Sequence, residues 1–130
     1  MGKHVLLIED EPNIIQAISF ILARDGWLVS NHGDGADAIA VVGRLKPDMI
    51  ILDLMLPGRS GFEILADLRA DPATEALPVL MLTAKSQARD RELAAHYGAS
   101  RFMTKPFANR EILATVREMA GDGSAGAAPA

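Results

Sequence analysis

The chain has 130 residues, of which 49% are hydrophobic and 23% charged, and this composition is typical of one soluble globular domain. With 13 basic and 17 acidic residues it carries a formal net charge of −4, which disfavours a nucleic-acid-binding surface. Cysteine is absent, which excludes disulfides, thiolate zinc sites and cysteine nucleophiles. The sequence contains neither an apolar run near the roughly 20 residues of a membrane helix nor a signal-peptide pattern. We therefore expect a cytoplasmic protein that makes no direct contact with nucleic acid or a membrane.

Short, continuous apolar runs alternate along the chain with stretches of helical periodicity. The runs are typical of strands buried on both faces, and they occupy residues 5–8, 27–29, 49–52, 79–82 and 102–103. The helical stretches show apolar side chains three or four residues apart, within residues 14–22, 36–45, 62–68, 93–97 and 112–119. Five strands alternating with five helices predict an α/β fold, in which a doubly wound parallel sheet has helices on both faces.

The last ten residues differ from the rest of the chain. Residues 121–130 are Gly, Asp, Ser, Ala and Pro only, and such a segment offers almost nothing to a hydrophobic core. We predict an ordered domain over residues 1–120 and a flexible tail or linker over residues 121–130.

Polar residues follow the predicted strands. They are, in chain order, Glu9, Asp10, Glu11, Asp53, Thr83, Thr104 and Lys105. The carboxyl ends of parallel strands share one edge of the sheet, where ligands bind. Clustered carboxylates repel one another, and Mg²⁺ relieves that repulsion with the oxygen ligands it prefers. An Asp carboxylate can attack phosphorus, and an amine and a hydroxyl can position a phosphoryl group, so this set indicates phosphoryl chemistry.

Four segments, residues 5–11, 48–61, 78–84 and 105–107, make the sequence resemble the receiver domain of two-component response regulators. The resemblance covers residues 3 to about 119 and is closest to single receivers of the chemotaxis type. It implies a flavodoxin-like fold with strand order 2-1-3-4-5. It also implies a signalling switch that catalyses only its own phosphorylation and dephosphorylation.

The resemblance assigns a role to each residue that matches the family motif. Asp53 would accept a phosphoryl group from a histidine kinase or a histidine phosphotransfer protein. Mg²⁺ would be bound by Asp10, by Asp53, by the backbone carbonyl of Met55 and, through a water, by Glu9. Lys105 would pair with the phosphoryl oxygens, and its peptide bond to Pro106 is expected to be cis.

Two further residues would couple the pocket to a partner surface. Thr83 would hydrogen-bond to the phosphoryl group, and Phe102 would then rotate inward, switching the face formed by the fourth helix, fifth strand and fifth helix for a downstream protein target. Residues 99–101 and Thr115 depart from the charge pattern of family members that form symmetric dimers, so we expect a monomer or a weak, phosphorylation-dependent dimer. Glu11 has no family role here and is expected to be an acid in the first helical turn, where the helix dipole favours it.

Two alternatives remain open. The chain could be the receiver of a longer regulator whose C-terminal part is an output domain. It could also be a phosphatase of the haloacid dehalogenase type, but that family requires a second Asp two residues after the nucleophile, and Met55 stands there. Trp27 is expected to begin the second strand, at the end away from the pocket.

Overall fold

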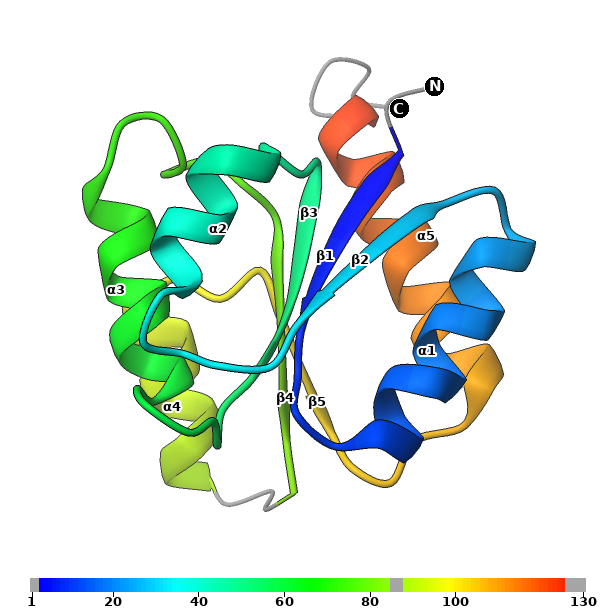
Figure 1. Cartoon of the computed structure of the whole chain (residues 1–130), viewed down its shortest axis with the longest axis horizontal. Coiled ribbons are helices and arrows are strands. Elements are labelled where there is room, and N and C mark those ends of the chain that lie inside the picture. Colours follow the sequence, from blue (N-terminus) through cyan, green and yellow to red (C-terminus); the bar gives the residue numbers. More distant parts are fainter. Residues whose placement is uncertain (1–2, 85–87, 126–130) are drawn as a thin grey trace.

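The computed structural model describes residues 3–84 and 88–125 as a five-stranded parallel sheet with helices on both faces (Figure 1). The strands are β1 (His4–Ile8), β2 (Leu28–His32), β3 (Met49–Asp53), β4 (Val79–Thr83) and β5 (Arg101–Thr104). The helices are α1 (Pro12–Arg24), α2 (Ala38–Leu45), α3 (Gly61–Ala70), α4 (Ala88–Tyr97) and α5 (Asn109–Ala125). The strand order is β2-β1-β3-β4-β5, which confirms the predicted fold class.

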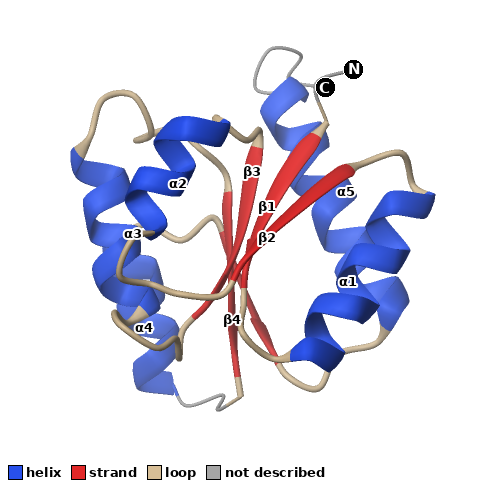
Figure 2. Ribbon diagram, viewed as in Figure 1, coloured by secondary structure: helices blue, strands red, loops and turns tan. Residues whose placement is uncertain are grey.

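The sheet separates two layers of helices. Helices α1 and α5 cover one face, and α2, α3 and α4 cover the other (Figure 2). Within β1, Val5 and Leu7 face α1 and α5, whereas Leu6 and Ile8 face the opposite layer. This alternation explains the continuous apolar runs, because every position of a central parallel strand is covered by one helical layer or the other.

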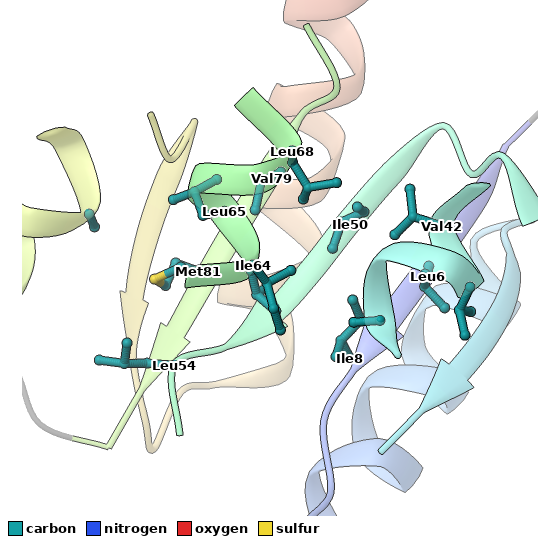
Figure 3. Packing of buried hydrophobic residues seen from close by; sticks show 14 residues of the cluster. Leu6, Ile8, Val42, Ile50, Leu54, Ile64, Leu65, Leu68, Val79 and Met81 are labelled. Atoms are coloured by element: carbon teal, nitrogen blue, oxygen red, sulfur yellow. The ribbon is translucent and has the colours of Figure 1, made fainter. Parts of the chain in front are cut away.

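The core under α2 and α3 fixes the position of the central strands (Figure 3). Leu6, Ile50 and Met81 come from three neighbouring strands, and Ile64 and Leu65 of α3 pack over them. All five side chains are completely buried. Burying a side chain of this size contributes roughly 1.5–3 kcal/mol to the stability of the fold. This packing therefore holds the carboxyl ends of the strands in place.

Local signals set where the helices begin. In α1, Pro12 occupies the first helical turn, where a missing backbone N–H costs nothing, and Glu11 is the N-cap without a side-chain capping bond. The expectation that Glu11 belongs to the first turn was therefore wrong by one position. In α3, Ser60 and Glu63 form a reciprocal capping box, with N–O distances of 3.3 and 3.1 Å.

Two features lie at the end of the sheet opposite the polar residues. Trp27 is 6% exposed and directly precedes β2, so it lies one residue before the strand that we expected it to begin. Helix α5 continues to Ala125, which places residues 121–125 in a helix rather than in the predicted tail, and residues 126–130 of that prediction lie outside the described residues. Once formed, a helix extends by one hydrogen bond for each residue added, even where composition alone predicts a loop.

Within the described ranges, no helix combines the length and apolar character needed to cross a membrane.

Candidate functional site

Three carboxylates meet at the carboxyl edge of the sheet. Oxygens of Glu9, Asp10 and Asp53 all lie within 4.8 Å of one another. The sheet order causes this meeting, since β1 and β3 are hydrogen-bonded neighbours although some forty residues separate them in sequence. Glu9 is completely buried and Asp53 is 3% exposed, whereas Asp10 is exposed. The cluster is thus an acidic pocket that opens to solvent at Asp10.

Lys105 brings one ammonium group into this pocket. Its Nζ lies 3.0 Å from Glu9 Oε1 and 3.5 Å from Asp53 Oδ1. A third carboxylate, that of Glu11, lies 2.8 Å from the same nitrogen. The Lys105 backbone N–H donates to the carbonyl oxygen of Thr83 at 2.7 Å, which extends the β4–β5 pairing beyond the strands. The Lys105–Pro106 peptide bond is cis, the conformation that the resemblance implies.

Burial and mutual repulsion set the charge state of the pocket. The pKa of Asp53 is raised from 3.8 to about 6, mainly because burial disfavours its charged form and secondly because Glu9 repels it. The nearby Lys105 ammonium opposes this shift. For Lys105, burial lowers the pKa, but hydrogen bonds to Glu11 and Glu9 and the charge of Asp53 outweigh burial and leave it raised. The described residues of the pocket therefore carry an excess of negative charge that a cation would neutralise.

The donor set fits a hard divalent cation. Glu9 Oε2 accepts the backbone N–H groups of Asp10 and Glu11, at 3.2 and 3.0 Å. Its other oxygen, Oε1, is buried and lies 3.0 Å from Lys105 Nζ, and it has a further lone pair that can accept a bond from a metal-bound water. Asp10 presents an exposed carboxylate beside it. Within the described part of the chain, the candidate metal ligands gathered here are carboxylate oxygens, and oxygen ligands are those that Mg²⁺ prefers.

Met55 is tied to the pocket by its backbone. Its N–H donates to Asp53 Oδ1 at 3.2 Å, whereas the residue as a whole is 71% exposed. The side chain is therefore directed largely to solvent, and any part that Met55 plays in the site falls to its main chain.

Thr83 and Phe102, the two residues predicted to form a switch, lie on the neighbouring strands β4 and β5. Thr83 ends β4 and is 1% exposed, and its ladder partner on β5 is Thr104. Phe102 is half-buried and packs against the core under α3 and α4. The guanidinium carbon of Arg91 lies 5.1 Å from the centre of the Phe102 ring. A groove of about 360 Å³ adjoins them, and its lining includes Arg91, Phe102, Glu111 and Thr115.

The structure assigns Glu11 a contact that our sequence reasoning missed. Its carboxylate accepts a hydrogen bond from Lys105 Nζ at 2.8 Å, across 94 positions of sequence. The available signal was its place directly after Glu9 and Asp10, at the same strand end.

The chain is similar to known response regulators over most of its length. The family model of the response regulator receiver domain matches residues 5–117. A probable transcriptional regulatory protein, TcrX of Mycobacterium tuberculosis, is 39% identical over 115 residues, which are 88% of this chain and 48% of that protein. The DNA-binding response regulator MtrA of Mycolicibacterium smegmatis is 37% identical over 117 residues, 90% of this chain and 50% of MtrA. The chain thus spans about half the length of these relatives.

A solved structure extends the similarity to three dimensions. The receiver domain of the sensor histidine kinase PA1611 from Pseudomonas aeruginosa superposes with a TM-score of 0.84 at 29% identity, covering 93% of this chain and 99% of that domain. That structure is described as having a magnesium ion coordinated in its active-site cleft.

Proposed function

Because the chain belongs to the response regulator receiver family, we propose that Asp53 accepts a phosphoryl group from a histidine kinase or a histidine phosphotransfer protein. One observation carries this proposal: a buried carboxylate at the end of β3 lies within 4.8 Å of two further carboxylates and 3.5 Å from an ammonium group. This arrangement supplies a nucleophile, a cation site and a positive charge for the phosphoryl oxygens.

Mg²⁺ is the cofactor that we infer for the transfer. Asp10 and Asp53 would bind it through their carboxylates, Met55 through its backbone carbonyl and Glu9 through a water. When bound, the cation neutralises charge on the phosphoryl oxygens. The three carboxylates that the described residues bring together support this assignment.

The protein's own side chains carry the transfer itself. An Asp53 oxygen attacks phosphorus, the bond from phosphorus to the donor's histidine nitrogen breaks, and an aspartyl phosphate forms. Lys105 donates hydrogen bonds to the phosphoryl oxygens, and the Thr83 hydroxyl does so once the group is in place. In this role Lys105 and Thr83 position and stabilise charge, while no proton has to leave the nucleophile at pH values where it is ionised.

The output of the switch is a surface rather than a reaction. We propose that phosphorylation moves Thr83 and Phe102 and so changes the face formed by α4, β5 and α5, where a downstream protein binds. The position of Phe102 beside the groove, half-buried under Arg91, supports this choice of face. Such a switch needs two packings of similar free energy, which a half-buried aromatic ring provides more readily than a fully buried one.

A receiver within a longer regulator is the second arrangement that the comparisons favour. This chain covers only 48% and 50% of the lengths of TcrX and MtrA, and MtrA is named as DNA-binding. The expectation that this protein has no contact with nucleic acid therefore stays a prediction. A phosphatase of the haloacid dehalogenase type is disfavoured, because Met55 lacks the carboxyl group that such an enzyme uses as general acid.

The test is intact mass after incubation with acetyl phosphate and Mg²⁺. We expect the mass of one added phosphoryl group, and we expect its loss in Asp53→Asn or when the metal is chelated. An adduct that persists in Asp53→Asn would place the acceptor elsewhere. Steady release of phosphate from a generic phosphate ester would instead favour the phosphatase.

A further inference from the structure

Lys105 lies at unequal distances from its three carboxylate partners. Its Nζ lies 2.8 Å from Glu11 and 3.0 Å from Glu9, but 3.5 Å from Asp53. Charge-assisted N–H···O contacts are usually about 2.7–2.9 Å long. In this resting state, Lys105 is therefore bound most closely to the acid for which sequence reasoning found no role, and least closely to the proposed acceptor.

The two close partners of Lys105 differ in their freedom to move. Glu9 is completely buried, and its second oxygen accepts two backbone N–H groups. The Glu11 side chain is 58% exposed, and it makes no capping bond to the helix that it precedes. Glu11 can turn into solvent at little cost, whereas Glu9 cannot, so the Glu11 contact is the one that yields when Lys105 is needed elsewhere.

We propose that Glu11 is a positioning residue that holds the Lys105 ammonium in the resting pocket and thereby restrains phosphorylation of Asp53. The inference rests on the proposed function, in which Lys105 must donate to the incoming phosphoryl oxygens. An ammonium group has three N–H donors, and the three carboxylates around it already provide one acceptor for each of them. A phosphoryl group can recruit Lys105 only when one of these contacts is given up.

The expected size of the effect follows from the exposure of Glu11. An ion pair with an exposed partner contributes little free energy. Its loss changes a rate or an equilibrium constant by about two- to fivefold. We expect Glu11→Gln to be phosphorylated faster than the unchanged protein by this factor. Glu75→Gln is the matched control, because it removes the same charge from an exposed position on the α3–β4 connection, and its rate should not change.

Two phosphodonors separate a held lysine from simple repulsion at the pocket mouth. Acetyl phosphate is largely doubly charged at neutral pH, and phosphoramidate carries less net negative charge. If Glu11 acts by holding Lys105, Glu11→Gln accelerates phosphorylation by the same factor with both donors. Acceleration confined to acetyl phosphate, no change, or a slower reaction would each overturn the proposal.

A second measurement needs neither donor nor metal, so it separates failure of this inference from failure of the proposed function. Unfolding of the unchanged protein, Glu11→Gln, Lys105→Met and the double variant is followed in urea with a chelator present. We expect the effects on the unfolding equilibrium constant to be coupled by about two- to fivefold, the magnitude typical of an exposed ion pair. Effects that simply multiply would show that the pair does not hold Lys105, whether or not Asp53 is phosphorylated.

Discussion

Replacing Asp53 by Asn should stabilise the metal-free protein. The carboxylate is 3% exposed and lies beside the buried Glu9, and these two features raise its pKa to about 6. Asn has nearly the same shape, keeps an oxygen that can accept the N–H of Met55, and carries no charge. Lys105 Nζ retains its closer contacts with Glu9 and Glu11. The substitution therefore removes a buried charge and little else.

The sign and size of the expected stabilisation follow from the raised pKa of Asp53. Because the folded-state pKa lies above the unfolded value of 3.8, folding favours the protonated form. The cost of the charge is absent below about pH 4, grows between pH 4 and 6, and is complete above pH 6. At about 1.36 kcal/mol per pKa unit, the shift sets an upper limit of about 3 kcal/mol. Solvent reaches the pocket through the exposed Asp10 and weakens these interactions, so we expect a gain of about 1–2 kcal/mol at pH 7.5.

The assay is urea unfolding with a chelator present, at pH 7.5 and again at pH 4. Asp48→Asn is the matched control, since Asp48 is exposed just before the start of the same strand, and Asn keeps an oxygen that can accept the His4 N–H. The difference in stability between Asp48→Asn and the unchanged protein should be nearly the same at the two pH values. Adding Mg²⁺ should then stabilise the unchanged protein more than Asp53→Asn, because a cation that binds only the folded state raises its stability. If Asp53→Asn is no more stable than the unchanged protein at pH 7.5, the buried Asp53 charge does not destabilise the fold.

Two further predictions concern parts of the molecule away from the pocket. Trp27 is buried at the opposite end of the sheet, so its fluorescence should respond little to Mg²⁺; a large quench on titration would contradict its placement. The Arg69 guanidinium donates to the carbonyl oxygens of Leu77 at 2.7 Å, Gly98 at 2.9 Å and Glu75 at 3.0 Å, so it ties α3 to the start of β4 and the end of α4. Arg69→Met should lower the free energy of unfolding by about 2 kcal/mol, measured in urea, and an unchanged midpoint would show that these bonds do not hold α4.

The sequence is sufficient for the fold because the strand pattern is extreme. Every residue of β3 and β4 is buried, and only strands covered on both faces produce such runs. The weaker elements were harder to place. Helix α4 buries only Ala94, so its apolar pattern in the sequence is sparse. At its far end, α5 extends to Ala125 through residues whose composition predicts a tail, because helix extension depends on the preceding turns as well as on local propensity.

The site was predictable where topology alone brings residues together. Carboxyl ends of neighbouring parallel strands share an edge, which is enough to place Asp53 beside Asp10. The contact between Glu11 and Lys105 depends instead on side-chain reach across 94 positions of sequence, and a strand-and-helix pattern carries no information about it. Composition also conceals the pocket, since an excess of 4 acids does not reveal how the acids are distributed.

The distribution of charge explains why one pocket can be both costly and useful. Among the described residues, the Lys105 ammonium contacts Glu9, Glu11 and Asp53, and Asp10 lies beside Glu9 and Asp53. These groups together carry more negative than positive charge. A divalent cation would supply the missing positive charge, and a phosphoryl group would compete with Glu11 for Lys105. Each event therefore changes which carboxylate the Lys105 ammonium contacts most closely. The instability that Asp53→Asn should relieve is, on this reasoning, the same imbalance that makes the pocket responsive to metal and phosphodonor.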